Sequence, residues 1–129
     1  MTSYLIDTSV IIDYLRGKDL AVELLDNIEG EFFSSYVCLD EIYEGVYRVK
    51  NSEEMAAVVT KFFSSLSGMY GLGAGIAEKF GEIRAELKKQ GSIIEDLDLL
   101  LVATCLTYDL TLITFNKKHF SRIKNLRLY

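Results

Sequence analysis

The segment from Glu95 to Tyr108 constrains the fold more than any other, because it is apolar on almost every side. Its apolar residues are Leu97, Leu99, Leu100, Leu101, Val102, Ala103, Cys105 and Leu106. A helix with this pattern is normally buried on most sides. No apolar run in the chain reaches the roughly 18 residues that a membrane-spanning helix needs. The segment therefore predicts a buried helix in the core of a folded domain.

Strands and helices alternate along the chain. Short strands are expected at Tyr4–Ile6, Glu31–Ser35, Met69–Leu72 and Leu110–Thr114, with a last edge strand at Leu126–Leu128. Helices are expected at Thr8–Arg16, Asp19–Ile28, Tyr36–Val49, Ser52–Leu66, Ile76–Gln90 and Glu95–Tyr108, and Gly17 and Gly91 provide stops. This alternation predicts an α/β fold with a largely parallel sheet and helices on both faces.

The 129 residues, half of them hydrophobic, are expected to form a single domain over 1–129. The N-terminus has no basic region before its apolar residues and no cleavage site, so a signal peptide is not predicted and a cytoplasmic location is expected. Cys38 and Cys105 sit among apolar neighbours without metal-ligand spacing, which favours buried, reduced thiols over a disulfide.

A net charge of −5 argues against a protein that coats nucleic acid through a broad basic face. It does not exclude an enzyme that acts on nucleic acid, because clustered carboxylates tolerate phosphate once a metal ion is bound. The placement of the acidic residues is therefore more informative than their number.

Asp7 follows an apolar strand and precedes a helix. Ligands bind at the carboxyl ends of strands in open α/β sheets, but an aspartate here also caps a helix well. Thr114 and Asn116 hold the same place after the Leu110–Ile113 strand, and a parallel sheet would put them beside Asp7. Asn116 could also serve as a simple turn residue.

Glu41 lies off the apolar stripe of its helix, on a face shared with Cys38 and Gly45. A carboxylate on such a face needs a partner, because burying an unpaired charge is costly. Glu44, one turn further on, could project the same way. Both residues also fit a solvated helix edge.

Asp98 opens the apolar helix together with Glu95 and Asp96. The helix dipole favours acids in a first turn, but this explains Asp98 least well, since Leu97 and Leu99 flank it. Carboxylates from a strand end, a helix face and a helix start converge only around something positive, because repulsion would otherwise keep one protonated. Oxygen ligands without a His or Cys cluster select Mg²⁺ or Mn²⁺, and the single histidine, His119, is expected to be peripheral.

Four motifs, in order over the whole chain, resemble the PIN-domain family, and specifically its VapC-type ribonuclease toxins. They are Leu5-Ile6-Asp7-Thr8-Ser9, Glu41-Ile42-Tyr43-Glu44-Gly45, the run from Gly91 through Asp98 to Ala103, and Leu112-Ile113-Thr114-Phe115-Asn116 with Phe120. Each motif is weak alone, and the four together are specific. The resemblance implies a three-layer α/β/α sandwich around a central, mainly parallel sheet.

The resemblance also implies site roles and partners. Asp7, Glu41 and Asp98 would bind Mg²⁺ or Mn²⁺, and Asn116 would contribute more weakly, since many relatives carry aspartate there. Ser9 and Thr114 would supply hydroxyls that orient a carboxylate or water. The implied activity is in-line hydrolysis of RNA phosphodiester bonds, with a cognate antitoxin as partner and a homodimer as the assembly.

Particular residues argue for or against other classes of protein. A haloacid-dehalogenase-type phosphatase needs a second aspartate where this chain has Ser9. A receiver domain needs a phosphate-accepting aspartate after a middle strand, and only Glu53 and Glu54 are available there. A catalytically weak PIN-like module that binds RNA or protein is favoured by Asn116. A DNA nuclease would be expected to carry a basic arm, which this chain lacks.

Overall fold

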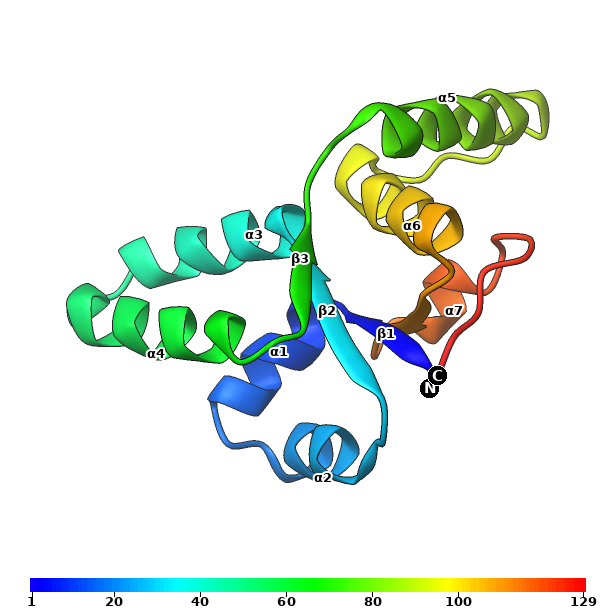
Figure 1. The fold of residues 1–129 in the computed structure, drawn as a ribbon. Coiled ribbons are helices and arrows are strands. Elements are labelled where there is room, and N and C mark those ends of the chain that lie inside the picture. Colours follow the sequence, from blue (N-terminus) through cyan, green and yellow to red (C-terminus); the bar gives the residue numbers. More distant parts are fainter.

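The strands of the computed structural model, which describes residues 1–129, form one parallel sheet (Figure 1). They are β1 (Ser3–Ile6), β2 (Glu31–Ser35), β3 (Gly68–Tyr70) and β4 (Thr111–Ile113), in the order β3-β2-β1-β4. Each neighbouring pair is parallel, as the alternation of strands and helices predicted.

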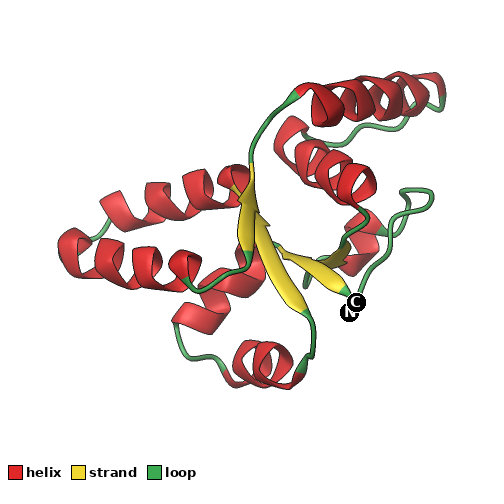
Figure 2. Cartoon of the chain, viewed as in Figure 1, coloured by secondary structure: helices red, strands yellow, loops and turns green.

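Helices cover the sheet on both sides, which confirms the predicted three-layer architecture (Figure 2). They are α1 (Thr8–Leu15), α2 (Asp19–Asn27), α3 (Tyr36–Tyr47), α4 (Ser52–Ser64), α5 (Ala74–Lys89), α6 (Asp96–Tyr108) and α7 (Lys117–Phe120). In Figure 1, α1 to α4 lie to one side of the sheet and α5 to α7 to the other. Gly17 and Gly91, both at φ +71°, follow α1 and α5 as the predicted stops.

The C-terminal part of the chain differs from the predicted pattern. The short helix α7 was not predicted, since its four residues are too few to show an apolar period. The edge strand expected at Leu126–Leu128 is reduced to one parallel bridge between Leu112 and Leu128. Earlier in the chain, the helix expected over Tyr36–Val49 ends at Tyr47 in α3, and Val49 is 44% exposed.

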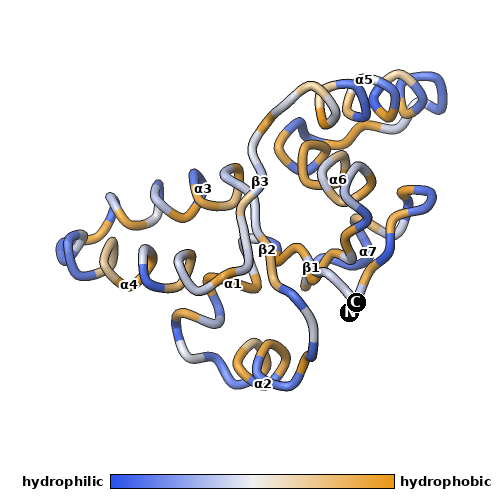
Figure 3. The backbone as a smooth tube through the Cα atoms, viewed as in Figure 1, coloured by the Kyte–Doolittle hydropathy of each residue, from blue (hydrophilic) through white to orange (hydrophobic).

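The core gathers 22 buried hydrophobic residues from the strands and the helices around them. Figure 3 shows the hydrophobic positions following the strands and α6, whereas much of α5 is hydrophilic. Cys38 and Cys105 are buried, unpaired thiols, as predicted, and burial raises the pKa of Cys38 to about 11. No helix combines the length and apolar character that a membrane span requires.

The register of β1 and β4 brings the polar strand ends together. Ile6 pairs with Ile113, so the next residues, Asp7 and Thr114, stand side by side where the two strands end. The Asp7 amide donates to the Ile113 carbonyl at 2.9 Å and extends this alignment by one residue. The candidate site is built on this edge.

Candidate active site

Asp7 both caps α1 and faces the neighbouring strand, so the two roles considered for it coexist. Its Oδ1 accepts a 2.7 Å hydrogen bond from the Thr8 amide. Its Oδ2 accepts a 2.8 Å hydrogen bond from the Thr114 hydroxyl. The residue is only 8% exposed, so both carboxylate oxygens are held in fixed positions.

Thr114 links Asp7 to the start of α7. Its hydroxyl, while donating to Asp7, accepts a 3.0 Å hydrogen bond from the Asn116 amide. Asn116 is the N-cap residue of α7, but its side chain makes no capping hydrogen bond. Asn116 is exposed, and its backbone amide is the group that contacts the Asp7–Thr114 pair.

Glu41 reaches the start of α1 from α3. Its Oε1 accepts a 2.8 Å hydrogen bond from the hydroxyl of Thr8, a residue that is 9% exposed. Although Glu41 as a whole is exposed, this hydrogen bond is partly buried. Thr8 therefore connects two of the predicted site acids, through its amide to Asp7 and through its hydroxyl to Glu41.

Asp98 lies in the first turn of α6 and contacts α7. Its Oδ2 is 3.0 Å from Nε2 of His119, and both side chains are partly buried. The Nε of Arg122 donates a 3.2 Å hydrogen bond to the backbone carbonyl of His119. The prediction that His119 is peripheral is therefore wrong, because α7 brings its ring into contact with Asp98 of α6.

Burial has the largest effect on the electrostatics of this site, and repulsion between acids adds to it. Burial raises the pKa of Asp7 above its usual value, against the Thr114 and Thr8 hydrogen bonds, and the charge of Asp98 raises it further. Burial likewise raises the pKa of Glu41; the Thr8 hydrogen bond opposes this, while the charges of Asp7, Asp98 and Asp40 add to it. Neighbouring acids therefore disfavour the ionisation of Asp7 and of Glu41.

No lysine or arginine forms an ion pair with these three acids. The lysine and arginine ion pairs of the chain use other acids, namely Asp13, Glu44, Glu82, Asp96 and Asp109. Three neighbouring carboxylates, without a lysine or arginine partner or a soft ligand set, are the donor chemistry of a hard divalent ion. The donor set therefore fits Mg²⁺ or Mn²⁺.

The carboxylates do not form a closed ligand cage. No group of three His, Cys, Asp or Glu side chains is close enough to hold a metal ion as the structure stands. Each acid is instead held by a partner: Asp7 by Thr114, Glu41 by Thr8 and Asp98 by His119. An ion would have to draw the three carboxylates closer together.

Other acids and hydroxyls considered from the sequence lie apart from this network. Glu44 points to solvent and pairs with Arg48 at 3.6 Å, so it belongs to a solvated helix edge. Asp96 pairs with Arg84 at 3.3 Å. Ser9, expected to orient a carboxylate, is exposed, and none of the side-chain hydrogen bonds at the site involves it. The hydroxyl that bonds Glu41 belongs to Thr8.

Sequence reasoning missed Thr8 and His119. Thr8 directly follows Asp7 within the first motif, and its position at the start of a helix was the available signal. His119 offered none, because the helix that carries it was not predicted. Its contact with Asp98 depends on how α7 packs against α6.

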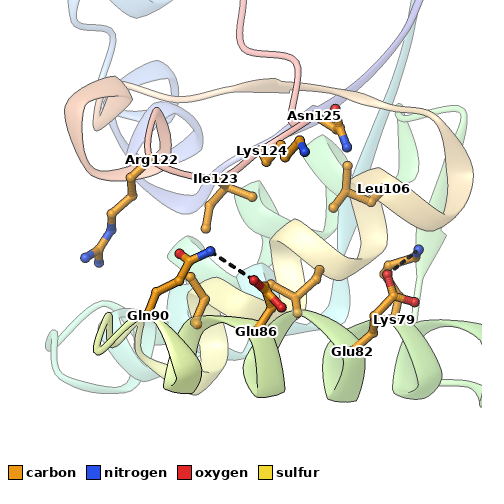
Figure 4. Close-up of a pocket in the computed structure, with 11 residues that line it drawn as sticks. Lys79, Glu82, Glu86, Gln90, Leu106, Arg122, Ile123, Lys124 and Asn125 are labelled. Carbon is orange, nitrogen blue, oxygen red and sulfur yellow. Dashed lines mark hydrogen bonds and ion pairs between the residues drawn. The ribbon is translucent and has the colours of Figure 1, made fainter.

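A hollow of about 600 Å³ lies away from the carboxylates, between α5 and the C-terminal segment (Figure 4). Its lining mixes charges, with Glu82 and Glu86 of α5 opposite Lys124. Gln90 donates to Glu86 at 3.2 Å within it. This hollow contains none of the predicted site residues.

Comparisons with known proteins agree with the motif pattern over almost the whole chain. Residues 4–126 match the model of the PIN domain. The chain is 33% identical over 124 residues to Ribonuclease VapC1 of Methanocaldococcus jannaschii, covering 96% of this chain and 83% of that protein. It is 29% identical over 128 residues to Ribonuclease VapC2 of Haemophilus influenzae, covering 98% and 96%. The crystal structure of VapBC2 from Rickettsia felis, bound to a DNA fragment from its promoter, superposes with a TM-score of 0.89 at 28% identity, covering 99% of this chain and 98% of that chain.

Proposed function

This chain belongs to the PIN-domain family, and from that premise we propose that it is an endoribonuclease that depends on Mg²⁺ or Mn²⁺. The observation that carries the proposal is the group of Asp7, Glu41 and Asp98, which has no lysine or arginine partner. The charge of Asp98 raises the pKa of Asp7, and the charges of Asp7 and Asp98 raise that of Glu41. Repelling acids held at the end of a parallel sheet are costly unless a cation joins them. The similarity to proteins named ribonuclease points to RNA as the substrate.

In this proposal Asp7, Glu41 and Asp98 hold the ion. The ion, when bound, activates water and stabilises the negative charge that develops on the phosphate. Thr114 fixes the Asp7 carboxylate, and Thr8 fixes that of Glu41, through the two 2.8 Å hydrogen bonds. Such hydrogen bonds keep ligand oxygens aimed at one point.

Asn116 and Ser9 have lesser roles in the proposal. Asn116, whose backbone amide bonds to Thr114, carries a side-chain amide oxygen but no charge. A second divalent ion near the first would need charge compensation more than the first does. We therefore expect one tight ion site in the absence of RNA. The exposed hydroxyl of Ser9 is left to orient water or substrate.

Cleavage of total RNA by the purified protein in Mg²⁺, Mn²⁺ and chelator tests the proposal. We expect cutting with either ion, none with chelator, and none from Asp98→Asn. Asp96→Asn is the matched control, because Asp96 lies in the same helical turn but pairs with Arg84. RNA binding without cutting would contradict the nuclease and favour a binding module, and cutting of DNA instead of RNA would make the chain a DNA nuclease.

We further propose that a cognate antitoxin neutralises the chain and that the chain forms a homodimer. The support is the family resemblance, together with the similarity to VapBC2 of Rickettsia felis over nearly the whole length. Light scattering of the purified protein should give twice the mass of one 14.6 kDa chain. Addition of the protein encoded beside it should abolish RNA cleavage, and unchanged cleavage would contradict the antitoxin assignment.

A further inference from the structure

Positive charge is concentrated at the C-terminal end of an otherwise acidic chain. None of the 19 acidic residues lies beyond Asp109, whereas five of the 14 basic residues do. These five are Lys117, Lys118, Arg122, Lys124 and Arg127. Although the whole chain has a net charge of −5, residues 110–129 contain no negatively charged side chain.

One of the five basic residues is paired with an acid, and two line a hollow that also contains acids. Arg127 forms a 2.6 Å ion pair with Asp109. Lys124 lines the hollow that also contains Glu82 and Glu86 (Figure 4). Arg122 lines the same hollow, but Arg122, Lys117 and Lys118 form no ion pair with a carboxylate. We call these three residues the α7 basic surface.

The α7 basic surface adjoins the carboxylate site. Lys117 and Lys118 are exposed in α7, between Asn116 and His119. Asn116 is tied to Thr114 at 3.0 Å, and His119 is 3.0 Å from Asp98. Both ends of the lysine pair are thus fixed to residues of the site.

Arg122 is held rigidly, but its charge is not neutralised. Its Nη2 donates to the Ile93 carbonyl at 2.9 Å, and its Nε donates to the His119 carbonyl. Carbonyl oxygens orient a guanidinium without cancelling its charge. The lysine pair and Arg122 therefore present positive potential beside a cluster of acids.

An acidic protein that cuts RNA must overcome repulsion of the phosphates that flank the cut. Lysine and arginine near such a path release counterions from the nucleic acid and supply binding that is independent of sequence. We propose that the α7 basic surface binds the phosphate backbone of the RNA substrate next to the carboxylate site. The inference rests on the proposed ribonuclease function, and it assigns the RNA a direction out of the site along α7.

Binding of a fluorescein-labelled oligouridine in chelator, followed by anisotropy over a range of KCl concentrations, tests the inference without cleavage. Lys117→Ala combined with Lys118→Ala should weaken binding on the order of 10-fold and flatten the slope of log affinity against log salt by about 1.4, since each single-strand phosphate contact contributes about 0.7. Both lysines are exposed, so the fold, checked by circular dichroism, should be kept.

Lys50→Ala combined with Lys61→Ala is the matched control. It removes the same charge from two exposed lysines at the α3–α4 turn and in α4, on the other side of the sheet (Figure 1). The control should keep the wild-type slope. An equal loss in both double variants would overturn the inference, because net charge alone would then explain the binding.

An unchanged slope in the α7 double variant would also overturn the inference. An acidic protein would then be the better candidate for the partner that binds this surface. These measurements distinguish failure of the inference from failure of the proposed function. A wild-type protein that cuts RNA in Mn²⁺ while the α7 variant binds normally contradicts only the inference. A wild-type protein that binds oligouridine through α7 but cuts no RNA contradicts only the nuclease.

Discussion

Glu41 shows how burial and neighbouring charges make one ionised carboxylate unfavourable in the folded chain. Burial raises its pKa, and the charges of Asp7, Asp98 and Asp40 add to this effect. Glu41→Gln keeps an oxygen for the Thr8 hydroxyl and removes the repelled charge. We expect the variant to melt at a higher temperature than wild type in chelator at neutral pH, although its activity falls.

The pH dependence of this gain follows from the raised pKa. Below the usual value of 4.5, Glu41 is protonated whether the chain is folded or unfolded, so variant and wild type should melt alike. As pH rises from 4.5 toward the raised pKa, the carboxyl ionises in the unfolded chain before it does in the folded wild type, so the gain grows; above the raised pKa it levels off. Glu44→Gln, one turn away at the solvated edge, should show no such trend. A lower melting temperature for Glu41→Gln would mean that the carboxylate is structurally needed.

Thr114 offers a second prediction at the scale of one residue. Thr114→Val removes the donor to Asp7 and the acceptor for the Asn116 amide without changing the shape of the side chain. Mn²⁺ affinity, measured by calorimetry, should fall roughly 10- to 100-fold, as for other partners that orient metal ligands.

Thr104→Val is the control for Thr114→Val. Thr104 is equally buried, but its hydroxyl donates only to the Leu100 carbonyl within α6. The control should keep its Mn²⁺ affinity. Equal affinities for the two variants would show that the Thr114 hydroxyl does not orient a metal ligand.

At the scale of elements, the sequence predicts what depends on local pattern and on parallel pairing. The predicted strand Glu31–Ser35 matches β2 because Phe32 and Phe33 sit between polar ends. The sequence also predicts that Asp7 and Thr114 lie close together, because parallel strands end at the same edge of a sheet. The pairing of Ile6 with Ile113 confirms this.

Contacts between helices could not be predicted in the same way. The Thr8–Glu41 hydrogen bond spans 33 residues, and the His119–Asp98 contact spans 21. Both depend on how one helix packs against another, which no periodicity encodes. The same limit applies to α7, which has one buried side chain that packs against the core.

Phe120 is that side chain, at 1% exposed, and it fixes α7 to the core. Phe120→Ala should cost about 3–5 kcal/mol of unfolding free energy and should release α7 from α6. Because His119 is the only histidine, its ring signals in NMR report that release directly. Phe115→Ala, at a site 38% exposed in the same segment, should change neither stability nor the ring signals much. A His119 signal unchanged in Phe120→Ala would mean that α7 is held by other contacts.

At the scale of the whole molecule, the proposed ion would connect parts of the chain that are remote in sequence. Asp7 follows β1, Glu41 lies in α3 and Asp98 opens α6, so ligation would join the sheet to helices on both of its sides. In the unfolded chain these three carboxylates are far apart and bind an ion weakly. Metal binding should therefore stabilise the folded state of the molecule as a unit.

Thermal unfolding in increasing Mn²⁺ measures this coupling. At about 100 times the dissociation constant, an ion that binds only the folded chain adds about 2.7 kcal/mol, which raises the melting temperature on the order of 10 °C for a domain of this size. Asp98→Asn should lose most of this rise, and Asp96→Asn, paired with Arg84 in the same turn, should keep it. If Mn²⁺ raised the melting temperature of all three proteins equally, the ion would bind elsewhere, and the assignment of Asp98 as a ligand would be wrong.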